Sequence, residues 1–375
     1  MRYFLLLASF VFIFSGKSQL VNQARQGQEK KVQVAILFDT SNSMDGLINQ
    51  ARARIWSIIN TLSKLEYQGV KPSLEISLYE YGNSGLSEST KFIRQLNGFT
   101  TDLDSISSSL FALSTNGGKE YCGSVISEAT KDLDWSEYTE DIRLIYIAGN
   151  EPFDQGPDDY KNVLKYAQDR DIFVSTIYCG PYEKGVEELW LSAAEKGRGK
   201  YLNIDSDKKI KHISTPYDDT IRKLNTKLNG TYVSYGSHGK AKKSMQMKED
   251  ENAADMAPSS AVERTVSKSS GYYKNESWDL VDRVGDDESK LKDIKADQLP
   301  EELQGKSDKE KMAYLKLKAL ERKAIQDKIQ SLGEKRADFI KEKSSEETDE
   351  DDDFGKAVES SIKSFALAKN YVLNN

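Results

Sequence analysis

Three oxygen-bearing side chains follow one apolar segment at alternate positions. The stretch VQVAILFDTSNSM, residues 32–44, passes from apolar residues into Asp39, Ser41 and Ser43. Carboxylates and hydroxyls are hard oxygen ligands, which suit Mg²⁺, because this ion prefers octahedral oxygen coordination and keeps several of its waters. The spacing D-x-S-x-S therefore indicates a divalent cation site at the end of a strand.

The elements that must position these side chains alternate between strands and helices. Apolar runs and period-two alternation predict strands, and apolar residues at three- and four-residue steps predict helices. Such an order implies right-handed crossovers and an α/β fold, a doubly wound and mostly parallel sheet flanked by helices. The predicted strands are 32–38, 73–81, 91–96 (short and at an edge), 141–149, 172–180 and 199–204, and the main helices are 44–65, 102–113, 160–168, 186–196 and 218–228.

Ligand sites in such sheets form beyond the carboxyl ends of the strands. Asp39, Asn150 and Cys179 each follow or end a predicted buried strand. We therefore expect three loops without mutual sequence similarity to meet at this edge.

The motif FDTSNSM, followed by an amphipathic helix, resembles that of a von Willebrand factor A (vWA) domain over residues 30–228. In that family the motif forms a metal-ion-dependent adhesion site (MIDAS), which a Thr and an Asp from two further loops complete. The resemblance implies that Asp39, Ser41 and Ser43 hold Mg²⁺, or Mn²⁺ or Ca²⁺. It also implies that the metal accepts a carboxylate from a protein partner.

The two further loops depart from the family pattern. Where the family has TDG, this chain has AGN, with Gly149 at the position of the Asp; Asn150 and Glu151 follow it. The loop TNGGKEYCG has no Thr after its glycines, but Thr115 precedes them and Glu120 follows. Thr115, Glu120, Asn150 and Glu151 are therefore further possible ligands. A degenerate, metal-free vWA domain acting as an interaction scaffold is the alternative.

The chain has two cysteines, Cys122 after the glycine-rich loop and Cys179 at the end of a predicted strand. Both would lie at the carboxyl edge, and export would expose them to an oxidising compartment. We predict a disulfide between them, with two buried free thiols as the alternative.

The N-terminus has the pattern of an export signal. Arg2 precedes the apolar segment YFLLLASFVFIF, which is shorter than the ~20 residues of a membrane-spanning helix. Gly16 and Ser18 fit a small-residue cleavage site, so residues 1–18 are expected to be a signal peptide of an exported bacterial protein. The protein would be periplasmic, in the cell envelope or secreted. An uncleaved signal is the alternative and would provide the only membrane contact.

The sequence changes character after the predicted vWA domain. Residues 230–271 are polar and predict a flexible linker. Residues 272–375 predict a charged, mainly helical region with a long helix candidate at 299–343, which suits a hairpin or a partner-binding helix better than a strong coiled coil, and an acidic run, EETDEDDD, at 346–353.

Composition and motifs leave two classes of function. A net charge of −7 excludes duplex nucleic acid as a natural partner. A metal-dependent protein-binding module, without enzymatic activity, is the first class. A metal-dependent hydrolase, in which the cation activates water, is the second; it would need Glu120 or Glu151 as general base. Ser41 has no histidine in a plausible supporting loop, so a hydrolase triad is not expected.

Overall fold

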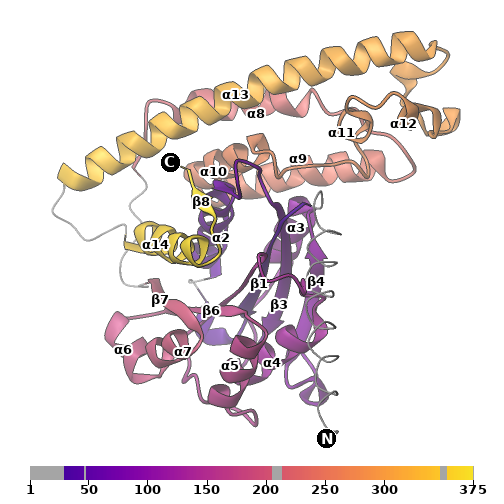
Figure 1. Cartoon of the computed structure of the whole chain (residues 1–375). Helices are drawn as coiled ribbons and strands as arrows, with labels where there is room; N and C mark the ends of the chain where they lie inside the picture. Colours follow the sequence, from indigo (N-terminus) through magenta and orange to yellow (C-terminus); the bar gives the residue numbers. More distant parts are fainter. Residues whose placement is uncertain (1–28, 46–47, 205–212, 347–352, 375) are drawn as a thin grey trace, which may run out of the picture.

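The computed structural model describes residues 29–45, 48–204, 213–346 and 353–374 (Figure 1). Its centre is a six-stranded sheet with the order β4-β3-β1-β5-β6-β7. All neighbouring strands pair in parallel, except that the edge strand β4 is antiparallel to β3. The predicted fold class is thus confirmed. The strands are β1 (Lys31–Asp39), β3 (Ser73–Tyr81), β4 (Ile93–Thr100), β5 (Ile142–Gly149), β6 (Phe173–Cys179) and β7 (Arg198–Ile204).

The central strand β1 lies between β3 and β5, and every residue after Lys31 is buried. A parallel strand covered on both faces needs a continuous apolar run, which VQVAILF provides. The chain adds strands to one side of β1 and then, from β5, to the other. The strand order therefore reverses between β1 and β5, and this is the place where doubly wound sheets form their ligand sites.

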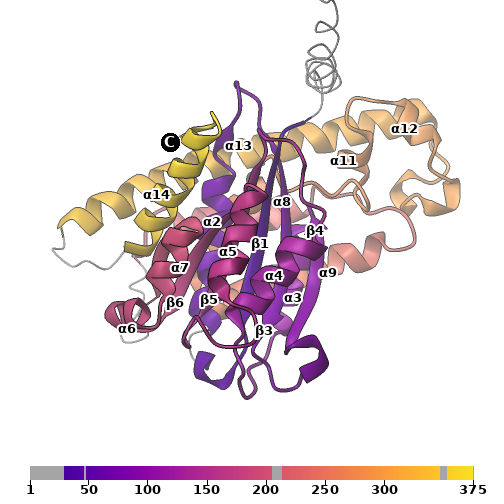
Figure 2. The ribbon, with the colours of Figure 1, turned by 60° about the horizontal axis from the view of Figure 1, so that its bottom comes forward.

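Helices cover both faces of the sheet. On one face lie α4 (Cys122–Asp132), α5 (Tyr160–Asp169) and α7 (Trp190–Lys196), in front of the strands in Figure 2. The other face packs against α2 (Ile48–Leu62), α3 (Leu103–Ala112) and α14 (Asp353–Ala368). The side chain of Asp102 caps α3 by accepting a hydrogen bond from the Ser105 amide at 3.0 Å, which stabilises the first turn.

The helix α14 comes from far along the sequence yet belongs to the sheet domain. It packs on α2 and β7, and Phe365 lies 4.8 Å from Phe173 of β6 between ring centroids. The following strand β8 (Val372–Leu373) pairs with β2 (Leu65–Glu66). By contrast α8 (Asp218–Asn229), predicted as the final helix of the vWA domain, packs on α10 (Pro258–Ser269) and α13 (Asp308–Glu346).

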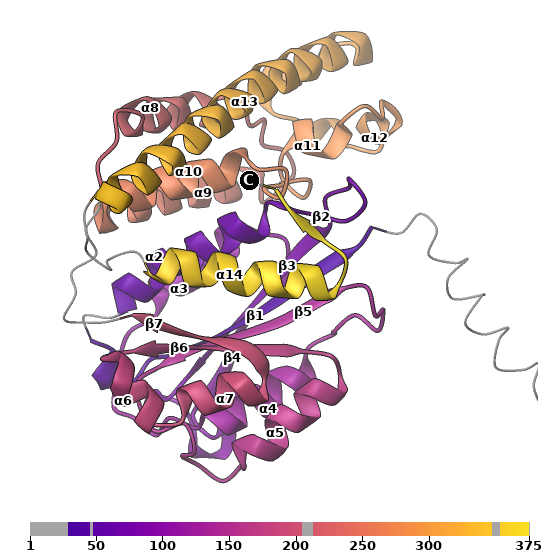
Figure 3. The ribbon, with the colours of Figure 1, turned by 60° about the vertical axis from the view of Figure 1, so that its left-hand side comes forward.

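A further layer of helices lies outside α2 and α3 (Figure 3). The helix α9 (Gly239–Met256) packs on α3, and α10 packs on α2. The predicted flexible linker at 230–271 is therefore wrong, because these two helices occupy most of it. The predicted long charged helix is present as α13, which packs on α8 and α10 of the same chain.

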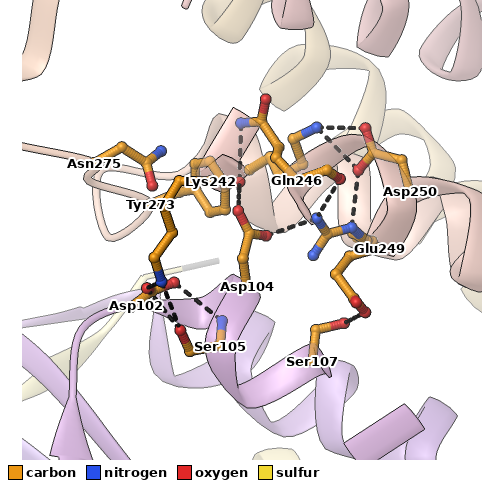
Figure 4. A network of polar contacts seen from close by, with 12 residues as sticks. Asp102, Asp104, Ser105, Ser107, Lys242, Gln246, Glu249, Asp250, Tyr273 and Asn275 are labelled. Carbon is orange, nitrogen blue, oxygen red and sulfur yellow. Dashed lines mark hydrogen bonds and ion pairs between the residues drawn. The ribbon is translucent and has the colours of Figure 1, made fainter. Parts of the chain in front are cut away.

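The outer helices are joined to α3 by a cluster of buried charges, shown in Figure 4. Arg264 of α10 donates to Asp104 of α3 at 2.7 Å and to Asp250 of α9 at 2.8 Å. Lys268 donates to both Asp250 oxygens, at 2.9 and 2.7 Å. We call Asp104, Asp250, Arg264 and Lys268 the buried charge cluster. Polar residues that meet partners in this way can be buried without an apolar sequence pattern, which explains why the linker prediction failed.

A smaller apolar cluster joins the segment 280–303 to the start of α13. It contains Leu280 and Val284 of α11 (Leu280–Val284), Leu291 of α12 (Ser289–Lys292), and Met312 and Leu315 of α13. Over the described ranges, no helix is both long and apolar enough to cross a membrane. The predicted signal peptide lies outside the described residues, as does most of the predicted acidic run.

Candidate functional site

The predicted metal motif lies at the carboxyl end of β1, beside the point where the strand order reverses. Asp39 is completely buried. Its Oδ1 accepts a hydrogen bond from the Ser41 amide at 2.8 Å, whereas its Oδ2 has no partner among the described residues. Buried polar atoms nearly always have partners, so this oxygen is the atom of the motif that a bound ligand could satisfy.

The two serines and Asn150 form a continuous chain of oxygen atoms. Ser43 lies in a 3₁₀ turn, η1 (Asn42–Met44), and Ser41 directly precedes it. The Ser41 and Ser43 hydroxyls are 2.8 Å apart, and Ser43 donates to Asn150 Oδ1 at 2.8 Å. The Asn150 amide group in turn donates to the Ser43 carbonyl at 3.0 Å. The structure thus brings Asn150, the first residue after β5, directly against the motif.

The glycine-rich loop between α3 and α4 also joins the motif through its backbone. Asn116 donates to the Thr40 carbonyl at 3.0 Å, and Asn42 donates to the Gly117 carbonyl at 2.7 Å. Of the two side chains predicted from this loop, Thr115 donates its hydroxyl to Asp45. Glu120 is buried, with 7% of its surface exposed.

Two glycines, Gly82 and Gly118, lie against the side chains of Asp39 and Glu120, where any other residue would clash. A Cβ atom on Gly82 would lie 2.6 Å from Asp39 Oδ1 and 3.1 Å from Glu120 Cγ, and one on Gly118 would clash with Glu120 Oε1 and lie 3.2 Å from Ser41 Cβ. These points make Glu120 a neighbour of both Asp39 and Ser41. Sequence reasoning missed Gly82, although its position directly after the strand SLYEY was a signal that could have found it.

Gly149, at the position of the family's Asp, is explained by its surroundings. A Cβ there would lie 2.5 Å from the Tyr81 hydroxyl oxygen, 3.0 Å from the Trp190 ring and 3.2 Å from Asp39 Cβ. The Tyr81 hydroxyl donates to the Ala148 carbonyl at 3.1 Å and fills this corner. A side chain therefore does not fit at residue 149, and the neighbouring Asn150 and Glu151 are the candidates of the third loop.

The electrostatics of the edge favour a bound cation. Burial is the main cause that raises the pKa of Asp39 to about 8, and the charges of Glu120 and Glu151 add to this rise. Hydrogen bonds from Ser41 lower the pKa but do not offset the effect of burial. Burial also raises the pKa of Glu120, and Glu151 adds to this shift. A cation would reverse these shifts because it stabilises the ionised carboxylates.

The predicted disulfide is wrong. Cys122 and Cys179 are both free and buried. Cys122 belongs to the apolar cluster under α4 and α5, and Cys179 belongs to the cluster on the opposite face of the sheet. The sulfur of Cys122 instead contacts the Tyr81 hydroxyl at 3.6 Å. Sharing the carboxyl edge was not sufficient for pairing, because the two side chains point to opposite faces.

The donor set fits a hard divalent cation bound partly through water. The described residues contain no group of three or more His, Cys, Asp or Glu arranged to hold a metal. Asp39 with its unpaired oxygen, two hydroxyls and the nearby Glu120 are the oxygen donors that Mg²⁺ or Mn²⁺ accepts while retaining waters. Asp39, Ser41 and Ser43 would hold the ion, with Glu120, Asn150 and Glu151 around it.

Comparisons with known proteins give a partial picture. No family model and no curated protein sequence matches the chain. Among solved structures it is similar to the hypothetical protein BatB from Bacteroides thetaiotaomicron, with 17% identity, coverage of 46% of this chain and 90% of that one, and a TM-score of 0.36. It is also similar to the VWA domain of SpRpn10, with 16% identity, 48% and 90% coverage, and a TM-score of 0.35.

A third similar structure is proximal thread matrix protein 1 from the mussel byssus, with a zinc-occupied MIDAS motif. The identity is 10%, the match covers 48% of this chain and 43% of that one, and the TM-score is 0.35. All three matches cover less than half of this chain. The fold therefore rests on the strand order itself: a mostly parallel, doubly wound sheet between helices, as in a vWA domain.

Proposed function

We propose that this protein is an exported, metal-dependent protein-binding module with no enzymatic activity of its own. A divalent cation, Mg²⁺ or Mn²⁺, binds to Asp39, Ser41 and Ser43 at the carboxyl edge of the sheet. A coordination position left to water then accepts a carboxylate from a protein partner. The observation that carries the proposal is the unpaired Oδ2 of the fully buried Asp39 beside the two serine hydroxyls.

The exposure of the motif suits binding to a macromolecule. Asp39 and Ser41 are buried, but Ser43 and Asp45 are exposed, so the site opens at its serine side. A cation there would be bound on its buried side by the Asp39 carboxylate and would remain accessible to a partner on its solvent side. Export is proposed from the N-terminal sequence pattern described above.

Titration calorimetry of the chain from residue 19, with MgCl₂ or MnCl₂, tests the metal site. Wild type is expected to bind one ion, and Asp39→Asn is expected to bind none, because the variant removes the anionic ligand. Asp154→Asn is the matched control, since Asp154 is an exposed carboxylate on the loop after β5. No binding by wild type, or equal binding by all three proteins, would contradict the proposal.

A pull-down from envelope extract then tests the partner. Capture of the same protein with Mg²⁺, but not with chelator or with Asp39→Asn, is the expected result. Capture that ignores both changes would favour the metal-free scaffold.

A further inference from the structure

The second loop of the site presents a carboxylate where the family pattern has a hydroxyl. Glu120 is 7% exposed, and its side chain lies near Gly82, the residue after β3, and near Ser41 of the motif. Gly82 and Gly118 lack the side chains that would otherwise separate it from Asp39 and Ser41. Thr115, the hydroxyl residue of the same loop, is held by Asp45.

A buried carboxylate beside a second buried carboxylate needs a reason. No lysine or arginine forms a salt bridge with Glu120 or Asp39 over the described parts of the chain. Two like charges in a water-poor site repel each other. The unpaired Oδ2 belongs to the same buried carboxyl group, whose Oδ1 lies on the side of Gly82 and Glu120. A cation between the two side chains satisfies the unpaired oxygen and removes the repulsion.

We propose that Glu120 is a direct carboxylate ligand of the cation, opposite Asp39, in place of the threonine of the vWA pattern. This inference rests on the proposed metal site and adds to it a second protein charge. Two carboxylates neutralise a divalent ion, so the chain retains the cation in the absence of a partner.

Coordination also occupies the Glu120 side chain. A carboxylate that ligates the metal is not available as a general base for a metal-bound water. The inference therefore removes Glu120 as a candidate general base and leaves Glu151 as the base that the hydrolase alternative would need.

Mn²⁺ affinity of four full-length mature proteins, measured by calorimetry and by the electron paramagnetic resonance signal of free Mn²⁺, tests the inference. Glu120→Gln keeps the shape and removes the charge, Glu120→Asp keeps the charge and shortens the side chain, and Thr115→Val removes the hydroxyl of the alternative ligand. We expect Kd to rise about tenfold or more for both Glu120 variants and to stay unchanged for Thr115→Val. Thermal melting without metal checks that each variant is folded.

Each of the other outcomes contradicts either the role of Glu120 or the proposed metal site. Wild-type affinity in Glu120→Gln overturns Glu120 as a ligand and leaves the metal site intact. Wild-type affinity in Glu120→Asp, with weakening in Glu120→Gln, reduces Glu120 to a charge that acts through space. Weakening in Thr115→Val alone assigns the position to Thr115. Absence of Mn²⁺ binding in wild type overturns the proposed function and, with it, this inference. If Glu120→Gln is unfolded, Glu120→Asp and Thr115→Val decide the question.

Discussion

Two of the regions in which this molecule buries carboxylates differ in the partners that the carboxylates have. In the buried charge cluster, Asp104 accepts hydrogen bonds from Arg264 and from the Tyr273 hydroxyl, and Asp250 accepts from Arg264 and Lys268. At the carboxyl edge, Asp39 is equally buried but has an oxygen without a partner in the described structure, and its neighbours are the acids Glu120 and Glu151. Burial alone therefore does not mark a functional carboxylate. The surroundings distinguish the two: the carboxylates of the buried charge cluster have cationic partners, whereas Asp39 has an unpaired oxygen beside further acids, as the proposed metal site would require.

The largest expected effect on the free energy of unfolding comes from a substitution in the buried charge cluster. Arg264→Met leaves Asp104 and Asp250 buried without their shared cation, and removing one partner of a buried ion pair costs about 3–5 kcal/mol. Urea unfolding at pH 7 measures the loss. The double variant Arg264→Met with Asp104→Leu should recover part of the stability, because it removes one of the stranded charges. A loss below about 1 kcal/mol in the single variant would mean that the cluster does not hold the layers together.

The pH dependence of stability tests the buried charge cluster further. Burial alone would raise the pKa of Asp250, but Lys268 and Arg264 lower it to about 2 from the ordinary 3.8. Its pairing therefore contributes fully above about pH 4 and is lost as pH falls toward 2, a contribution of roughly 2 kcal/mol. Unfolding of wild type and Asp250→Asn at several pH values measures it. The stability difference between them should shrink by this amount from pH 5 to pH 2, and a constant difference would contradict the pairing.

The smallest effect on stability is expected at Asp39, where removal of the charge should stabilise the metal-free protein. Because the pKa of Asp39 is raised to about 8, its carboxylate destabilises the metal-free fold as pH rises above the ordinary value of 3.8. Asp39→Asn keeps an acceptor for the Ser41 amide but buries an amide N–H group without a partner, so it should recover only part of this cost, about 1–2 kcal/mol at pH 7. Millimolar Mg²⁺ should then stabilise wild type only. Thermal unfolding with and without Mg²⁺ measures both, and a destabilised Asp39→Asn would show that the carboxylate has a structural role.

The same contrast explains what could be predicted from the sequence. The apolar run VQVAILF predicted a buried strand, and the order of strands and helices predicted the sheet, because apolar burial leaves a periodic pattern. Asp39, Ser41, Ser43 and Asn150 were brought together because strand ends converge at one edge. Arg264 and Lys268 carried no such signal, since their burial depends on partners far away in sequence. The face on which Cys122 and Cys179 lie depended on strand register, which spacing alone did not reveal.

The contact between Leu65 and Leu373 in the strand pair β2–β8, together with α14 on the sheet, has a consequence for biosynthesis. A ribosome delivers β1 through β7 long before α14, so the emerging sheet has one face incompletely covered around Phe173. Its core can close only after the chain beyond residue 350 has been synthesised, because contacts so distant in sequence form late and slowly. A chain whose core stays open during synthesis can still be threaded through a pore, which would suit the export proposed above.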